Sequence, residues 1–507
     1  MDEIQLDGES LTPEGALAIS SGQYSVTLSP KSRKEMELSR SAVERVLDSG
    51  EVVYGINTGF GALSSVRISN DELEDLQTNL VRSHACGVGE RMEPEQSLLM
   101  MVIRANSLAK GISGARPEIV DHMLSMVNAR IAPVIPRIGS LGASGDLAPL
   151  SHMAMSMMGE GESSVYKRGQ WNVLPANSAL KEAGITPLKL QAKEGLSLIN
   201  GTSQMCAFLI ISLIRMERLV LAADFAVACS IEAIKGSHTP FDRRIHDSRP
   251  QFGQSTSAAR ISGLLANSKI ALSHVDCDRV QDAYCFRCAP QVHGPVIDQL
   301  REIRRILQIE INSATDNPLV FVEGDDVEII SGGNFHGQNL ALASDSLALA
   351  CHELASISER RINQILDPKW SGQKAFLANH EGLESGLMII QYVAAALISE
   401  LHLLANPATS SNVPVSMGKE DHVSMGATGT FRTLKATKLL SQVIANELIC
   451  SAEALDRIDE DPGEGVTKIH AWIRDSVASL EIDRSLTKEC ETLSEQIFGG
   501  SISEIFR

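Results

Sequence analysis

The sequence is poor in aromatic residues and in positive charge. Aromatic side chains occupy 4% of the 507 positions although 43% are hydrophobic, so a folded core must be mainly aliphatic. Lysine and arginine number 45 against 63 aspartates and glutamates, which gives a formal net charge of −18, and no basic run interrupts this balance. Because nucleic-acid binding depends on clustered lysine and arginine, the charge argues against a nucleic-acid partner.

The sequence also lacks the signals of export and of a membrane span. The N-terminus, Met1–Gln5, does not show the charged-then-apolar pattern of a secretory signal. The long apolar segment Met205–Ile234 is interrupted by Arg215 and Asp224, among other charged residues, too often for a hydrocarbon environment. We therefore expect a cytoplasmic protein in which Met205–Ile234 is a buried helix.

The nine cysteines are odd in number and come without a secretory signal, which fits a reducing compartment better than a disulfide framework. His274, Cys277, Cys285 and Cys288 have a spacing that would suit tetrahedral zinc. A metal site also needs converging ligands and supporting hydrogen bonds, and spacing alone supplies neither. We predict no metal.

Helix signals dominate the chain. Thr12-Pro13 and Ser29-Pro30 each place a capping residue before a proline suited to the first helical turn, and Ser49-Gly50 suits the end of the second helix. A third helix should start near Ser69-Asn70 and run toward His84. Further helices are predicted at 94–110, 116–130, 146–158, 176–184, 200–235, 291–314, 336–366, 383–405, 421–456, 465–479 and 484–496.

Strand signals are few. A hairpin is predicted around Arg168-Gly169, from Ser164–Lys167 and Gln170–Val173, and a single further strand at Leu319–Val322. No repeat or long linker marks independent modules. We expect a mainly α fold with three soft divisions: an N-terminal active-site region at 1–190, a central bundle of long helices at 191–410, and a C-terminal helical layer at 411–507.

The segment Gly139–Leu150, GSLGASGDLAPL, is the most informative part of the sequence. A generic cluster of glycine and serine usually marks a turn. A phosphate-binding loop would require Gly-Lys-Ser/Thr after it, which is absent, and Asp146 would repel a phosphate. A third interpretation is that the Ala-Ser-Gly core reacts with itself.

In that self-reaction the amide nitrogen of Gly145 attacks the carbonyl carbon of Ala143, and Ser144 loses water to leave an exposed methylidene. Glycine offers the least hindered nitrogen and tolerates a compressed backbone. The product is a methylidene-imidazolone ring (MIO). It is an electrophile, which ordinary catalytic side chains do not provide, and it needs no added cofactor.

Several long motifs accompany this segment in a fixed order. The sequence resembles the aromatic amino acid ammonia-lyases, and within them those acting on histidine, from about Leu11 to beyond Leu455. The matching motifs are Val53–Gly61, Asn79–His84, the Ala-Ser-Gly segment, Leu198–Thr202, Val280–Tyr284 with Arg287, Ser331–His336 and Glu420–Met425.

The resemblance implies a long helical bundle of the fumarase/aspartase-like type, a homotetramer whose active sites are built from several subunits, and MIO as the self-formed electrophile. The implied reaction is elimination of ammonia from L-histidine to give trans-urocanate, the first step of histidine degradation. The β-hydrogen is poorly acidic and an amine leaves poorly, so the reaction needs both a positioned base and the electrophile.

The resemblance also assigns roles to single residues. It makes Tyr54 the base, on a glycine-hinged lid that excludes water, although an isolated tyrosine is more often a packed aromatic. It makes Arg287 the group that binds the substrate carboxylate, because a guanidinium offers two donors in one plane. The alternative is that Arg287 forms an ordinary surface ion pair. The remaining residues hold the substrate and the ring or wall the pocket: Asn200, Gln281, Tyr284 and Phe335.

Substrate choice is expected to depend on His84 and Glu420. A glutamate can accept a hydrogen bond from an imidazole N–H, whereas it would be left unpaired against a phenyl ring. Taken alone, His84 would be read as a core histidine and Glu420 as an acid at a helix N-terminus. The sequence departs from the family here, because Gly418-Lys419-Glu420 stands where many relatives have Asn-Gln-Glu.

Two other functions would use parts of the same sequence pattern. One is a phenylalanine or tyrosine ammonia-lyase or an aminomutase with the same electrophile, which would differ in its products. The other is a scaffold that has lost catalysis. A scaffold has no physical need for Tyr54, Ser144, Arg287 and Glu420 together, so we expect an enzyme.

Overall fold

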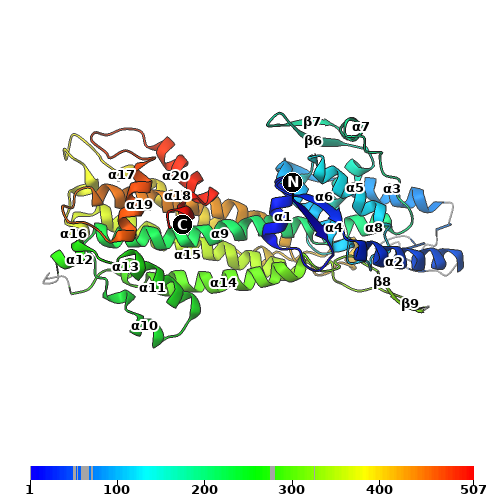
Figure 1. The fold of residues 1–507 in the computed structure, drawn as a ribbon, viewed down its shortest axis with the longest axis horizontal. Coiled ribbons are helices and arrows are strands. Elements are labelled where there is room, and N and C mark those ends of the chain that lie inside the picture. The colour runs from blue at the N-terminus through cyan, green and yellow to red at the C-terminus, as the bar shows by residue number, and fades with distance from the viewer. Residues whose placement is uncertain are drawn as a thin grey trace. The chain divides into compact units, whose positions relative to one another are not determined.

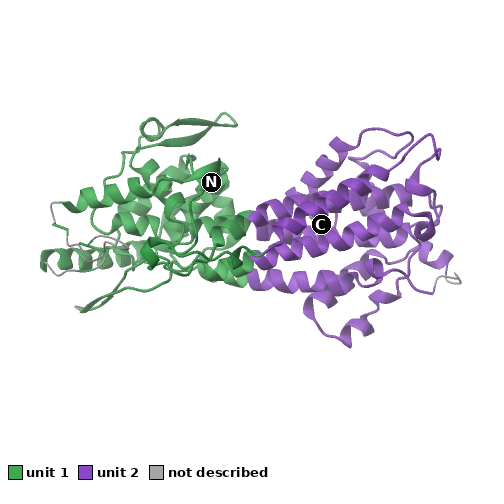
Figure 2. Ribbon diagram, turned by 180° about the vertical axis from the view of Figure 1, so that it is seen from behind, with its two compact units in different colours: residues 1–211, 304–344, 407–431 green, residues 212–303, 345–406, 432–507 purple. Residues whose placement is uncertain are grey.

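The computed structural model describes residues 2–49, 53, 55–58, 68–69, 72–274, 280–324 and 326–506. Its contacts divide the chain into two compact units, coloured separately in Figure 2. Unit 1 comprises residues 1–211, 304–344 and 407–431, and unit 2 comprises 212–303, 345–406 and 432–507. Each unit therefore collects three stretches that are far apart in the sequence, and the three consecutive divisions expected above stay a prediction.

The centre of unit 1 is α4 (Pro94–Leu108), where every residue from Ser97 to Leu108 is buried. It packs against its neighbours α1 and α5 and against a short strand, β4. Burial extends around all sides of this helix and includes the polar residues Arg104 and Asn106, as expected for a helix enclosed by its unit. The other helices of the unit's first stretch (Figure 1) are α1 (Pro13–Ser20), α2 (Pro30–Ser49), α3 (Leu73–His84), α5 (Pro117–Asn128), α6 (Leu147–Met157), α7 (Ala176–Glu182) and α8 (Glu194–Ile199).

The strands of unit 1 form small sheets. The pairs are β1 (Glu3–Leu6) parallel to β2 (Ser25–Leu28), β3 (Val88–Arg91) with β5 (Pro136–Ile138), β6 (Glu162–Lys167) with both β4 (Ile131–Pro133) and β7 (Gln170–Pro175), and β8 (Leu319–Glu323) with β9 (Asp326–Ile330). The β6–β7 hairpin confirms the prediction. The expectation of a single strand after Asn317-Pro318 was wrong, because β9 returns along β8.

Four long helices carry most of the predicted bundle: α9 (Ser203–Ala233), α14 (Ala289–Glu310), α15 (Gln338–Leu366) and α18 (Gly426–Leu455). Each has residues in both units. The charged residues of α9 are accommodated by pairing: Asp224 is fully buried and accepts a hydrogen bond from Ser257 at 2.6 Å. The prediction of a mainly α fold with a buried helix at Met205–Ile234 is confirmed.

Unit 2 adds shorter helices around these. They are α10 (Arg243–Asp247), α11 (Phe252–Leu264), α12 (Lys269–Ser273), α13 (Tyr284–Arg287), α16 (Pro368–Ser371), α17 (Met388–Leu404), α19 (Glu464–Arg474) and α20 (Thr487–Gly499). Short 3₁₀ turns complete the chain at Thr239–Phe241, Ala375–Leu377, Ala408–Ser410, Ser416–Gly418 and Ser501–Glu504, of which the third and fourth belong to unit 1.

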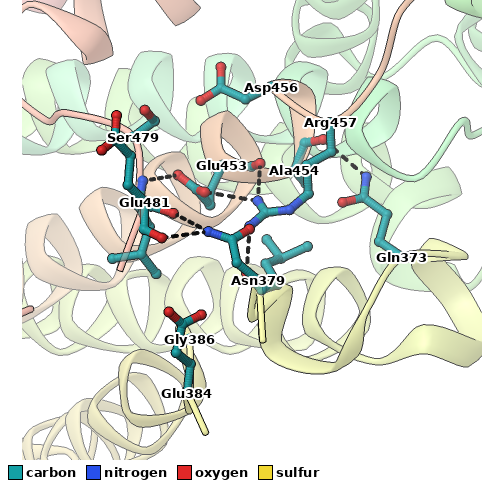
Figure 3. Close-up of polar contacts among 12 residues, drawn as sticks. Gln373, Asn379, Glu384, Gly386, Glu453, Ala454, Asp456, Arg457, Ser479 and Glu481 are labelled. Atoms are coloured by element: carbon teal, nitrogen blue, oxygen red, sulfur yellow. Dashed lines mark hydrogen bonds and ion pairs between the residues drawn. The ribbon is translucent and has the colours of Figure 1, made fainter. Parts of the chain in front are cut away.

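A polar network fixes the loops of unit 2 that follow α16 and α19 (Figure 3). The Asn379 amide donates to the carbonyls of Leu480 and Glu481 at 2.8 and 3.0 Å. Arg457, at the end of α18, donates to the Asn379 side-chain oxygen at 2.9 Å and to Glu453 at 2.8 Å. Charged and amide side chains thus add to the backbone hydrogen bonds of these loops.

Two helices are long and apolar enough to cross a membrane by length and composition. In α15, 56% of the apolar window is buried, whereas in the segment Met388–Ser410, which contains α17, 17% is buried. The apolar composition of α15 is explained by its burial inside the protein. Most of the apolar surface of α17 is exposed to solvent in the single chain.

Candidate active site

The Ala143-Ser144-Gly145 turn lies between β5 and α6 in unit 1. Gly142 and Gly145 have φ angles of +68° and +78°, a region that disfavours other residues. A Cβ atom on Gly145 would lie 2.2 Å from the carbonyl oxygen of Gly201. Both the backbone angle and this close approach therefore require glycine at the position whose nitrogen would close the ring.

The segment Asn200–Thr202 holds this turn from one side. Asn200 donates through Nδ2 to the carbonyl oxygen of Ser144 at 2.6 Å, and the backbone N–H of Asp146 donates to the Gly201 carbonyl at 2.7 Å. Asn200 is 3% exposed, so its amide is committed to the turn rather than to water. The structure thus brings together Asn200 and the Ala-Ser-Gly turn.

Asp146, which sequence reasoning did not assign to the site, is the fully buried acid beneath the turn. Its carboxyl oxygens accept hydrogen bonds from the Ser140 hydroxyl at 2.9 Å and from the backbone N–H groups of Gln204 and Met205 at 2.8 and 3.0 Å. Burial raises the pKa of Asp146 from 3.8 to about 7, and these hydrogen bonds oppose the rise. Its place directly after the Ser-Gly pair was the signal that could have found it.

Asp146→Asn should make the protein relatively more stable as the pH rises. Since the pKa of Asp146 is raised by folding, its favourable contribution is complete below its unfolded value of 3.8 and is lost as the pH rises through about 7. Asparagine does not titrate and keeps an oxygen for the two N–H groups. When urea midpoints are measured at pH 5, 6, 7 and 8, the midpoint of the variant should therefore rise relative to that of the parent as the pH increases.

Asp242→Asn is the control for this experiment. A hydrogen bond from Arg244 lowers the pKa of Asp242 to about 2, so its titration lies below the tested range. The difference in urea midpoint between this variant and the parent should stay constant from pH 5 to 8. A constant difference for Asp146→Asn as well would contradict the raised pKa of Asp146.

Two further segments attach to the other side of the turn. The hydroxyl of Ser424 and the backbone N–H of Gly337 both donate to the Gly142 carbonyl oxygen, at 2.8 and 3.0 Å. Met425 donates to the Leu141 carbonyl at 2.8 Å. These bonds bring the segments that carry Phe335 and Glu420 to the residues flanking Ala143.

Glu420 ends a narrow loop, and its backbone pairs with Val415 in both directions, at 2.9 and 3.3 Å. Between them Ser416 and Met417 have φ angles of +53° and +55°, an unusual conformation for residues other than glycine. The Glu420 side chain is partly buried.

His84 lies at the end of α3, which packs against α6 and α8. Its Nδ1 is 2.8 Å from the Leu80 carbonyl oxygen, which can only accept a hydrogen bond. Nδ1 must therefore carry the hydrogen, and Nε2 is left for another partner.

Gln281, Tyr284 and Arg287 belong to unit 2 and form a group of their own. Tyr284 is 70% exposed, and the Arg287 guanidinium lies over its ring at 4.9 Å from the centroid. Arg287 forms no ion pair within the part of the chain that the structure describes. Asp282 accepts from the backbone N–H of Ser237 at 2.7 Å and fixes this loop beside a cavity of about 330 Å³ that Gln281 helps to line.

Tyr54 lies outside the described residues, as does Cys277 of the spacing considered for zinc. Near Tyr54 the structure describes residues 53 and 55–58: Ile56 packs with Val43 and Val320, and Asn57 accepts through its side-chain oxygen from the Val53 N–H at 2.9 Å. No group of three histidine, cysteine, aspartate or glutamate side chains suited to a metal occurs among the described residues.

The chain is similar to known proteins over almost its whole length. A family model described as aromatic amino acid lyase matches residues 11–475. A histidine ammonia-lyase of Myxococcus xanthus is 44% identical over 98% of this chain and 97% of its own length.

Solved structures of two different activities are also similar. A histidine ammonia-lyase from Trypanosoma cruzi has a TM-score of 0.92 at 37% identity and covers 99% of this chain and 94% of its own. A tyrosine aminomutase from Streptomyces globisporus has a TM-score of 0.92 at 34% identity and covers 99% and 98%. Since the family model and these relatives span almost all of the sequence, the chain belongs to the aromatic amino acid lyase family.

Proposed function

We propose that this protein eliminates ammonia from L-histidine to give trans-urocanate, using MIO formed from Ala143, Ser144 and Gly145. The observation that carries the proposal is the turn itself, in which Gly145 lies so close to Gly201 that no side chain fits and Asn200 holds the Ser144 carbonyl. These residues fit the group, because both the positive φ of Gly145 and its close approach to Gly201 require glycine at the attacking nitrogen. MIO supplies an electrophile for the substrate amine.

The chain's own residues bind the substrate and move its proton. Arg287 holds the carboxylate with two parallel donors, and its lack of an ion pair among the described residues leaves it free to do so. Gln281 and Tyr284 supply further hydrogen bonds to the substrate, and Asn200 holds the Ser144 carbonyl of the ring-forming turn. Tyr54 takes the β-hydrogen.

The imidazole side of the substrate selects for histidine. Glu420 accepts from an imidazole N–H, and His84 lies on the same unit with its Nε2 unused by the Leu80 carbonyl. Phe335 lines the end of the site that receives the imidazole. A phenyl ring would leave the carboxylate without a donor, which disfavours phenylalanine and tyrosine.

An aminomutase or a phenylalanine or tyrosine lyase is the second candidate, because the fold does not separate these activities: the tyrosine aminomutase structure is as similar in TM-score as the histidine ammonia-lyase. The discriminating feature is Glu420 in place of an amide. Its role is tested by the products formed.

We propose a homotetramer. The residues Ile389, Tyr392 and Leu403 on α17 are 58%, 62% and 62% exposed, an apolar surface that another copy would cover. The exposed Tyr284 fits an active site completed by another subunit. Light scattering during size-exclusion chromatography should give four times the mass of one chain. The eight described cysteines are free, which fits the reducing cytoplasm.

The test of the function is an assay of purified protein without added cofactor or metal. L-Histidine, L-phenylalanine and L-tyrosine are supplied separately, and ammonia release and product absorbance are followed. We expect urocanate and ammonia from histidine alone. Cinnamate, coumarate or a β-amino acid would favour the second candidate, and no product from any of the three would contradict the proposed activity.

A further inference from the structure

Two imidazole rings stack beside the proposed substrate site. The rings of His336 and His422 are 5.8 Å apart between centroids with an interplanar angle of 8°. His336 directly follows Phe335, and His422 is two residues after Glu420. The stack therefore joins the two segments that carry the residues proposed to face the substrate imidazole.

The hydrogen bonds around His422 fix its tautomer. The backbone N–H of Val423 donates to the side-chain oxygen of Asn412 at 2.9 Å, which sets the orientation of that amide. Asn412 Nδ2 then faces His422 Nδ1 at 2.9 Å and must donate to it. His422 Nδ1 is therefore an acceptor, and the hydrogen of this neutral ring is on Nε2.

His336 is fixed in a similar way. Its Nε2 lies 3.2 Å from the backbone carbonyl oxygen of His422, which can only accept. Nε2 of His336 therefore carries a hydrogen and donates it across the stack. We call Asn412, His336 and His422 the histidine clasp.

The clasp is tied to the reactive turn at both ends. Beyond His336, the backbone of Gly337 donates to the Gly142 carbonyl oxygen, and beyond His422 the Ser424 hydroxyl donates to the same atom. A shift of either ring would therefore move Phe335 or Glu420 relative to a fixed point one residue before Ala143. Since interactions at an active site tolerate little displacement, such a device has functional consequences.

We propose that the histidine clasp positions Glu420 and Phe335 against the imidazole ring of the substrate. This inference depends on the proposed histidine elimination. The clasp residues act through Glu420 and Phe335 and are positioning residues.

Asn412→Asp tests the clasp with almost no change in shape. The carboxylate still accepts from Val423, but it cannot donate to His422, so Nδ1 of that ring must instead acquire a hydrogen. We expect KM for L-histidine to rise about 3- to 10-fold, about the energy of one hydrogen bond, because the bond to His422 reverses its direction and the hydrogen of that ring moves to Nδ1. The turn is unchanged, so kcat should change less than about 2-fold. The matched control is Asn172→Asp on the exposed hairpin strand β7, whose KM and kcat should equal those of the parent.

Two substitutions of His336 separate the stack from the hydrogen bond. His336→Gln keeps an N–H donor without the ring, and His336→Phe keeps a ring without the donor. Each should raise KM, and His336→Gln should be milder if the donor matters more than the stack. Thermal midpoints are compared alongside, so that a loss of folding is recognised by a lower midpoint rather than by kinetics.

The outcomes of the two proposals are distinguishable. A parent protein that releases no urocanate overturns the proposed function. An active parent with an Asn412→Asp variant of unchanged KM overturns the clasp alone. A variant in which kcat falls while KM is unchanged also overturns it, because positioning of the imidazole would then not be what Asn412 provides. A raised KM with retained kcat supports the clasp.

Discussion

Ser144→Ala should reduce histidine turnover by about 1000-fold or more while leaving the fold intact. Without the serine hydroxyl no methylidene can form, and the amine must leave without covalent assistance, so the lost transition-state stabilisation is on the order of 4 kcal/mol or greater. The fold should survive because the carbonyl of Ser144, which Asn200 binds at 2.6 Å, is retained in alanine.

Ser151→Ala on α6 is the matched control, because it removes a buried hydroxyl that donates to the Leu147 carbonyl at 2.7 Å in the same unit. It should remain active. Intact mass adds a second readout: ring formation releases two water molecules, so the parent should be lighter than its sequence by that amount and Ser144→Ala should not lose the water from Ser144. Full turnover by Ser144→Ala would exclude MIO as the electrophile.

The long helices and the reactive turn were predictable because their signals are local. The helices predicted at 94–110 and 200–235 agree with α4 and α9 within a few residues, and the glycines indicated a tight turn, which the positive φ angles of Gly142 and Gly145 fit. The β1–β2 pair was missed because it joins short strands across an intervening helix, a contact with no local sequence signal.

The tertiary parts of the site were not predictable in the same way. The two hydrogen bonds to the Gly142 carbonyl come from residues about 200 and 280 positions away. Neither a glycine at 337 nor a serine at 424 predicts such a contact from the sequence. The assignments of Arg287 and Glu420 came from resemblance rather than from a local pattern, and they stay predictions.

Glu447→Ala should destabilise the protein more than a typical core substitution. The Glu447 carboxylate binds Arg361 through Nε at 2.5 Å and through a terminal nitrogen at 2.8 Å, and both side chains are fully buried. It also accepts from Ser230 at 2.7 Å and Ser358 at 2.5 Å, so that α9, α15 and α18 meet at one acid. Its removal leaves a buried guanidinium unpaired, a loss of about 3–5 kcal/mol in the free energy of unfolding.

Urea denaturation at a fixed protein concentration measures this loss, since assembly would otherwise change the apparent stability. Asp247→Ala is the control, because its ion pair with Arg243 is largely exposed and should contribute less than about 1 kcal/mol. Arg361→Met combined with Glu447→Leu should recover more than half of the loss, because neither charge is then buried alone. If the single and double variants were equally unstable, packing around Glu447 rather than the unpaired charge of Arg361 would be the cause.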